Sequence, residues 1–137
     1  MSSPPTGARR RVLVVDDEPQ NLDTFRRVWR RYYDIEIAAS GEEALRALAT
    51  HEFDVVLTDY GMPGMNGADL VRIARTRFPI ALVMITGYID KPEVRELEDE
   101  GAVFAVLGKP WERAVLLDVV ERASQHTQVL RARSAPR

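Results

Sequence analysis

The sequence predicts an α/β domain built on a parallel β-sheet. Short runs rich in β-branched residues alternate about five times with longer amphipathic stretches, an order that is typical of βα units. The first run, residues 12–15, is apolar throughout, as expected for a strand that helices cover on both faces. A length of 137 residues fits a single domain.

Strands are expected where an apolar run stops abruptly at a polar residue or at a turn. Such runs are rich in valine and isoleucine, which favour the pleated surface of a sheet. The expected strands are residues 12–15, 35–39, 55–58, 80–85 and 103–107.

Helices are expected between these strands and after the last, and local signals predict where they begin. Pro19 opens the first helix, since a proline in the first turn lacks only an N–H that has no partner there. Ser40 and Glu43 have the spacing of a capping box ahead of a helix at residues 42–49. A third helix follows the loop at residues 61–67, and the last begins near Trp111.

The helix after the fourth strand has the weakest apolar face. Asp90 and Glu93 offer a reciprocal cap around Pro92, but only Val94 and Leu97 point inward among many charges. An element with so few apolar anchors opens at low free energy, so we expect this helix to be the part that moves.

The two ends of the chain differ in composition from the middle. Residues 1–9 are expected to form a flexible leader, residues 10–125 the domain, and residues 126–137 a helical extension that frays from residue 131. The leader has no apolar run behind its charges and so does not resemble a secretory signal. No apolar run is long enough to span a bilayer, so we expect a cytoplasmic protein with no membrane partner.

Composition excludes several kinds of site. There are no cysteines, which excludes disulfides, thiolate metal sites and cysteine nucleophiles. The formal net charge is -2, whereas a nucleic-acid surface needs a basic excess on one face. The short arginine clusters are therefore interpreted as solvated faces, and no nucleic-acid partner is expected.

Polar residues follow four of the expected strands. Asp16 and Asp17 follow the first, Asp59 the third, Thr86 the fourth and Lys109 the fifth. The carboxyl ends of parallel strands meet at one edge of an α/β sheet, so these side chains are expected to converge there. Three carboxylates repel one another unless a cation lies between them, and oxygen ligands suit Mg²⁺.

The same residues suit phosphoryl chemistry. A carboxylate oxygen can attack phosphorus and form an acyl phosphate, and Asp59 ends the middle strand of the set. Asp16 and Asp17 then suit metal binding, while Lys109 and Thr86 hold phosphoryl oxygens. Alone, each residue has a common structural reading, such as a helix cap or a turn; the combination favours a site.

Four motifs at the strand ends are specific when taken together. They are VVDDEP at 14–19, LTDYGMPGMNG at 57–67, ITGY at 85–88 and GKPW at 108–111. With these motifs, residues 10–125 resemble the receiver domain of bacterial two-component response regulators. The Tyr-Gly and Lys-Pro-Trp segments are similar in sequence to those of receivers from hydrogenase-type and cyclic-dinucleotide-phosphodiesterase-type regulators.

The resemblance implies a flavodoxin-like, five-stranded parallel sheet in the order 2-1-3-4-5, with helices on both faces. It implies that Asp59 accepts a phosphoryl group from a histidine kinase or phosphotransfer protein, and that the domain acts on a downstream protein. Asp17, Asp59 and the Gly61 carbonyl would bind Mg²⁺, with Asp16 acting through water. Lys109 would precede a cis-proline, Pro110.

One position departs from the family pattern. The switching aromatic three residues before Lys109 is Val106 here. Phe104 is two residues away and is expected on the same face of the strand, although inward packing is its expected role. Gly61 offers no side chain to position water and Tyr88 can cover the site, so slow self-dephosphorylation is expected.

Alternatives to the phospho-switch remain at this point. A receiver-like binding module that never meets phosphate is one, and an aspartate-nucleophile phosphohydrolase is another, although Gly61 cannot supply the acid/base group that such an enzyme needs. The leading hypothesis is a single-domain switch that phosphorylates and dephosphorylates itself rather than an enzyme. A homodimer through the last two helices, or through Val129 and Leu130, stays open.

Overall fold

The protein is described by a computed structural model that covers residues 9–134. Its sheet has five parallel strands in the order β2-β1-β3-β4-β5, which confirms the predicted α/β, flavodoxin-like fold. The leader at 1–8 and the end at 135–137 lie outside the described residues. The strands are β1 (Arg11–Val15), β2 (Asp34–Ala38), β3 (Val55–Asp59), β4 (Ala81–Thr86) and β5 (Ala105–Gly108).

A helix follows each strand, as the alternation predicts. The helices are α1 (Pro19–Trp29), α2 (Gly41–Thr50), α3 (Gly67–Arg77), α4 (Pro92–Asp99) and α5 (Arg113–Ser134). Among residues 9–134, no helix is long and apolar enough to cross a membrane.

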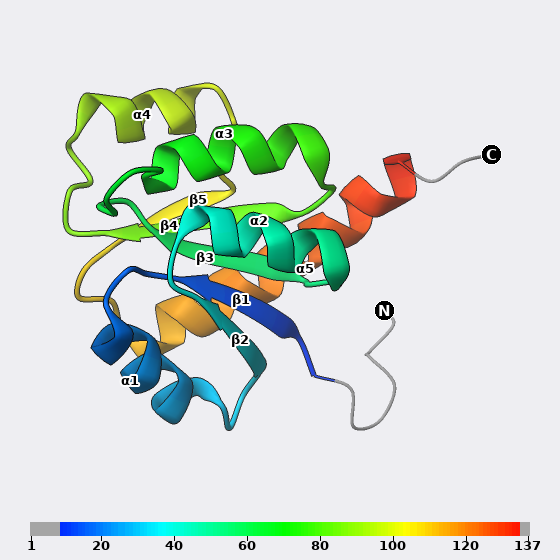
Figure 1. Cartoon of the computed structure of the whole chain (residues 1–137). Helices are drawn as coiled ribbons and strands as arrows, with labels where there is room; N and C mark the ends of the chain where they lie inside the picture. Colours follow the sequence, from blue (N-terminus) through cyan, green and yellow to red (C-terminus); the bar gives the residue numbers. More distant parts are fainter. Residues whose placement is uncertain (1–8, 135–137) are drawn as a thin grey trace.

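The helices cover both faces of the sheet (Figure 1). On one face, α1 and α5 pack through side chains such as Phe25, Trp29 and Leu116. On the other, α2, α3 and α4 pack through residues such as Leu48, Leu70 and Leu97. The central strands are buried on both sides, which explains why their sequences are apolar without alternation.

The strand register brings the carboxyl ends together. Val15, the last residue of β1, pairs with Thr58 of β3, and Asp59 pairs with Ile85 of β4. Thr86 pairs with Gly108 at the end of β5. The residues that follow these strands therefore emerge at one edge of the sheet, which is the edge at which the sequence predicts a site.

Helix starts agree with the sequence in part. Ser40 accepts a hydrogen bond from the Glu43 N–H at 3.1 Å, which is the first half of the predicted capping box. A complete box begins α3, where Asn66 accepts from the Asp69 N–H at 2.8 Å and the Asp69 carboxylate accepts from the Asn66 N–H at 3.1 Å. This second box was not predicted, although the sequence carries its signal, an Asn followed three residues later by an Asp.

The predicted cap of α4 is wrong. Lys91 is the N-cap residue and no side-chain cap is present there. The Glu93 carboxylate instead contacts Tyr60 and Arg72, which belong to other elements. The expectation that Val94 and Leu97 anchor this helix is confirmed, because both side chains are fully buried.

The C-terminal helix is longer and better anchored than the sequence suggests. Fraying from residue 131 is wrong for residues 131–134, because α5 runs to Ser134. Within it, the buried Thr127 hydroxyl donates to the Asp54 carbonyl at 2.6 Å and accepts from the Ala81 N–H at 2.9 Å. Arg131 lies 4.0 Å from the Asp54 carboxylate. This extension therefore joins the amino ends of β3 and β4.

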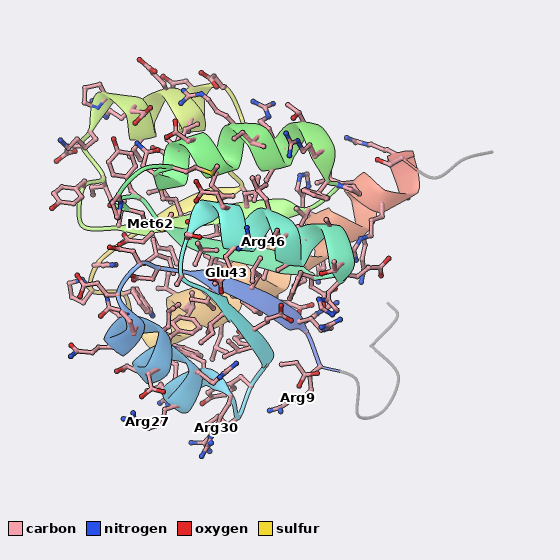
Figure 2. The ribbon with its side chains drawn as sticks, in the orientation of Figure 1. Arg9, Arg27, Arg30, Glu43, Arg46 and Met62 are labelled. Atoms are coloured by element: carbon pink, nitrogen blue, oxygen red, sulfur yellow. The ribbon has the colours of Figure 1, made fainter. Side chains whose placement is uncertain are left out.

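The arginines of α1 lie at the surface. Figure 2 shows Arg27 on the outer side of this helix, and Arg30 directly after its end. Arg27 pairs with Asp23 at 2.8 Å, and Arg9 donates to the Arg30 carbonyl at 2.8 Å. Exposed ion pairs contribute between about 0 and 1 kcal/mol to stability. These contacts therefore agree with the interpretation of the arginines as a solvated face.

Candidate phosphoacceptor site

Three carboxylates meet at the carboxyl edge of the sheet. Asp16 and Asp17 follow β1, and Asp59 is the last residue of β3. One oxygen from each of them lies within 4.8 Å of the others. The predicted convergence of these three side chains is therefore present in the structure.

Asp16 is buried and held in place by neighbouring donors. Its Oδ1 accepts a hydrogen bond from the Glu18 N–H at 2.9 Å, and its Oδ2 accepts from the Asn21 side-chain amide at 3.1 Å. Asn21 lies in the first turn of α1 and was not identified from the sequence, since its distance from Asp16 along the chain gives no motif. Its contact fixes the direction in which the Asp16 carboxylate points.

One oxygen of the Asp59 carboxylate, Oδ1, forms both an ion pair and a hydrogen bond. The Lys109 ammonium lies 3.4 Å from Asp59 Oδ1, and the Tyr60 N–H donates to this oxygen at 2.9 Å. Burial raises the pKa of Asp59 above its usual value, and the nearby Asp16 carboxylate adds to the rise, whereas Lys109 lowers this pKa. The ammonium thus favours the ionised form that a nucleophile requires.

Thr86 reaches the same edge but makes a different contact. Its side chain is fully buried, and its hydroxyl oxygen accepts a hydrogen bond from the Tyr88 N–H at 2.9 Å. The Lys109 N–H donates to the Thr86 carbonyl at 3.0 Å, which ties the ends of β4 and β5 together. The Lys109–Pro110 peptide bond is cis.

The loop after β3 folds back on the carboxyl end of that strand. The Gly67 N–H donates to the Tyr60 carbonyl at 2.8 Å. A Cβ at Gly67 would lie 2.1 Å from the Asp59 carbonyl oxygen, so only glycine fits there. Met62, labelled in Figure 2, is buried in this loop and packs into the core below α2 and α3.

Tyr88 lies beside Gly61. A Cβ at Gly61 would lie 3.8 Å from Tyr88 Cε2, although the Tyr88 side chain is 57% exposed. The Tyr60 and Tyr88 rings form an edge-to-face pair with centroids 6.4 Å apart. Two aromatic rings therefore lie on the Gly61 side of the site.

The predicted relation between Phe104 and Val106 is wrong. Val106 packs into the core on the α3 and α4 side of the sheet. Phe104 precedes β5 and packs on the opposite side, where its ring lies 5.3 Å from the His126 ring of α5. The alternation of a strand does not extend to Phe104 because this residue is outside the strand. Phe104 therefore does not share the face of the sheet that Val106 occupies.

An apolar groove borders the acidic cluster on the side of α1. It extends from Asp59 and Lys109 across aromatic side chains of α1 and of the segment before α5; among its lining residues are Phe25, Trp29 and Trp111. The Phe25 and Trp111 rings lie 6.3 Å apart and form part of its wall. The Asp59 carboxylate is thus accessible from a largely apolar surface.

The donor set fits a small divalent cation. Oxygens bound to one Mg²⁺ at about 2.1 Å lie no more than about 4.2 Å apart, so the three carboxylates need only a small approach to share an ion. All three donors are carboxylate oxygens, the ligands that a hard cation prefers. Burial chiefly raises the pKa of Asp59 and the Asp16 carboxylate adds to the rise; an ion there would oppose both effects by stabilising the ionised form.

Comparison with known proteins agrees with this fold and site. The family described as the response regulator receiver domain matches residues 12–121. The chain is 33% identical over 113 residues to the hydrogenase transcriptional regulatory protein HoxA of Cupriavidus necator, covering 82% of this chain and 23% of HoxA. It is 37% identical over 87 residues to the DNA-binding response regulator MtrA of Mycolicibacterium smegmatis, covering 63% of this chain and 38% of MtrA.

A solved structure shows the same arrangement of strands and helices. The CheY-like response regulator receiver domain protein of Methanospirillum hungatei superposes with a TM-score of 0.78 at 26% identity, covering 89% of this chain and 98% of that one. The chain therefore belongs to the response regulator receiver domain family. It spans less than half the length of the two curated relatives described above. Family membership supports a role in two-component phosphorelay signalling.

Proposed function

We propose that this domain accepts a phosphoryl group on Asp59, with Mg²⁺ bound, from a histidine kinase or phosphotransfer protein. One observation carries the proposal. The Asp59 carboxylate lies 3.4 Å from the Lys109 ammonium and within 4.8 Å of oxygens of Asp16 and Asp17. A nucleophile, a phosphoryl-binding cation and two metal ligands are thereby assembled at one edge of the sheet.

Phosphoryl transfer would form one bond at Asp59 as another bond breaks at the donor. One Asp59 oxygen attacks phosphorus as the bond from phosphorus to the donor breaks, and the donor leaves with that electron pair and takes up a proton. Lys109 neutralises part of the charge that spreads over the phosphoryl oxygens. The Thr86 hydroxyl, now bonded to the Tyr88 N–H, can rotate to meet one of these oxygens.

A bound Mg²⁺ supplies charge neutralisation for the incoming phosphoryl group. The residues that would hold it are Asp17 and Asp59 directly, the Gly61 carbonyl, and Asp16 through water. The hydrogen bonds on Asp16 from Glu18 and Asn21 support an outer role, since both of its oxygens already have donors.

The phosphoryl lifetime depends on access for water. Gly61 carries no side chain that could position water, and the Tyr88 ring lies next to it. We expect Tyr88→Ala to shorten the lifetime of the acyl phosphate severalfold, because the ring partly covers the site. The decay is measured by intact mass after the donor is removed, and an unchanged or longer lifetime would contradict this role.

The main test uses a small acyl-phosphate donor. Wild-type protein with Mg²⁺ is expected to gain the mass of one phosphoryl group, and Asp59→Asn is expected to gain none. Asp23→Asn is a matched control, because Asp23 is exposed and, among residues 9–134, its ion pair is with Arg27 on α1. Oligomeric state is measured in the same samples.

Two outcomes decide the proposal. Phosphorylation of Asp23→Asn but not of Asp59→Asn supports it. If wild type gains no phosphoryl group and also fails to bind beryllofluoride, the domain is not a phospho-switch and acts as a receiver-like binding module.

A further inference from the structure

Helix α4 is attached loosely to the rest of the domain. Within the described structure its buried side chains are Val94 and Leu97, and no side chain caps its first turn. Other α4 residues are exposed or half-buried and mostly charged. A helix with so few apolar contacts is sensitive to the polar contacts made by its first turn.

Tyr60 contacts both the phosphoacceptor and this helix. Its N–H donates to Asp59 Oδ1 at 2.9 Å, and its hydroxyl donates to Glu93 Oε1 at 2.7 Å. Glu93 lies in the first turn of α4. One residue therefore joins Asp59 Oδ1 to the helix with the fewest buried residues.

The position of the Tyr60 ring is restricted by its neighbours. Its ring packs edge-to-face on Tyr88, and the Lys91 ammonium lies 5.7 Å from the Tyr88 ring centre. Glu93 is also held from the other side, because Arg72 of α3 lies 3.3 Å from Glu93 Oε2. A small shift of the Tyr60 backbone therefore cannot be absorbed by free rotation and changes the hydroxyl contact.

We propose that Tyr60 is a positioning residue that links the chemical state of Asp59 to helix α4 through its hydroxyl contact with Glu93. This inference rests on the proposed phosphorylation of Asp59. In the unmodified domain, the contact holds the first turn of α4 against the loop after β3. When Asp59 is modified, the contact breaks and the first turn of α4 is loosened.

The direction of the effect follows from the acceptor strength of Asp59. An ionised carboxylate oxygen is a stronger acceptor than a neutral ester or carbonyl oxygen. Modification converts Asp59 Oδ1 into one of these weaker acceptors and offers Lys109 a phosphoryl oxygen instead. The Tyr60 N–H then loses its best partner, and the loop carrying its ring moves away from Glu93.

Strand β5 carries no aromatic side chain, which gives Tyr60 its importance. Val106 packs on the α3 and α4 side of the sheet, and Phe104 lies on the opposite side. The described residues thus provide the Tyr60 route to α4 without an aromatic side chain of β5.

Hydrogen exchange of the segment at 91–101 tests the link, with beryllofluoride and Mg²⁺ as the probe of the modified state. Tyr60→Phe removes only the hydroxyl. In wild type, beryllofluoride is expected to speed exchange of α4 about fivefold, the effect of losing one hydrogen bond to a charged group at a partly exposed site. In Tyr60→Phe, α4 is expected to exchange fast already and to change less than about twofold when the probe binds.

Two further variants separate the hydroxyl contact from general loosening. Tyr32→Phe removes the same atom from the connection between α1 and β2, and it is expected to behave as wild type. Glu93→Gln keeps an amide oxygen that can accept from Tyr60, so it is expected to retain much of the probe-dependent change. Beryllofluoride binding is followed by native mass spectrometry in every variant.

The outcomes distinguish this inference from the proposed function. If the probe binds wild type but α4 exchange does not change, or if Tyr60→Phe behaves as wild type, the link is wrong and the phosphoacceptor proposal stands. If wild type neither binds the probe nor gains a phosphoryl group from the acyl-phosphate donor, both proposals are overturned.

Discussion

Asp59 is placed among charges of both signs. Burial and the Asp16 carboxylate raise its pKa, and Lys109 opposes them. Burial therefore makes the ionised form of the Asp59 carboxylate, the proposed acceptor, less favourable in the folded domain, as is common at functional sites. This cost has a pH dependence that can be measured.

We expect the stability advantage of Asp59→Asn over wild type to grow as pH rises. Because the pKa of Asp59 is raised in the folded state, the folded protein holds this proton more tightly than the unfolded chain. The free energy of unfolding of wild type therefore falls as pH rises from the usual value of 3.8 through the raised one. Asparagine has no such change. Denaturant unfolding in chelator from about pH 3 to about pH 7 measures it.

Asp23→Asn serves as the control for this measurement, since Asp23 is exposed and lies on α1. The difference in the free energy of unfolding between Asp23→Asn and wild type should not change over the pH range in which Asp59 titrates. A difference for Asp59→Asn that stays constant or shrinks with pH would show that burial does not dominate at this carboxylate.

Gly67 is required because there is no room for a side chain, and not because of its backbone conformation. We expect Gly67→Ala to lower the free energy of unfolding by about 1–3 kcal/mol, because its Cβ would lie 2.1 Å from the Asp59 carbonyl. Gly87→Ala, at a glycine with open space around it, should stay within about 0.5 kcal/mol of wild type. Urea unfolding compares the two variants, and equal losses would contradict the steric argument.

At the scale of elements, helices α5 and α4 differ most in how many residues they bury. Helix α5 buries six residues and extends across the amino ends of β3 and β4, whereas α4 buries two. The Thr127 hydroxyl satisfies the Asp54 carbonyl and the Ala81 N–H together. The part of α5 after residue 125 is thus anchored to the sheet, whereas α4 has only two buried side chains.

Thr127→Val tests the anchoring of α5. Valine keeps the shape but leaves the Ala81 N–H and the Asp54 carbonyl without this partner, so we expect a loss of about 1–3 kcal/mol. The exposed Thr76→Val, whose hydroxyl bonds only within its own helix, should change stability by about 0.5 kcal/mol or less. Guanidinium unfolding gives both values, and a neutral Thr127→Val would mean that water replaces the hydroxyl.

At the scale of the whole molecule, the site joins strands that are distant in sequence. Asp16 and Asp17 follow β1, Asp59 ends β3 and Lys109 follows β5. A ligand bound among them stabilises the folded domain as a unit, because the unfolded chain cannot bring these groups together.

Mg²⁺ is therefore expected to stabilise the wild-type domain. At about 100 times the dissociation constant, the gain is about 2.7 kcal/mol. Asp17→Asn should lose most of this gain, because it removes one of the three carboxylates. Thermal unfolding with MgCl₂, compared with NaCl at equal ionic strength, measures the shift. An equal shift in wild type and Asp17→Asn would place the ion elsewhere.

The sequence by itself determined the fold class and the main members of the site. Alternation of apolar runs with amphipathic stretches is a local pattern, and it is sufficient for a parallel α/β sheet. The carboxyl ends of parallel strands share one edge, so the convergence of Asp16, Asp17, Asp59 and Lys109 follows from where each strand ends. Val94 and Leu97 were correctly identified as the anchors of α4 by their helical spacing.

Only the tertiary structure decided which partners the remaining side chains have. Glu93 has the spacing of a helix cap, yet it contacts Tyr60 and Arg72. Phe104 is two residues from Val106, yet it packs on the other side of the sheet because the strand begins after it. The physical reason is the same in both cases: contacts between elements depend on where each element begins and how helices lie on the sheet, and local periodicity specifies neither.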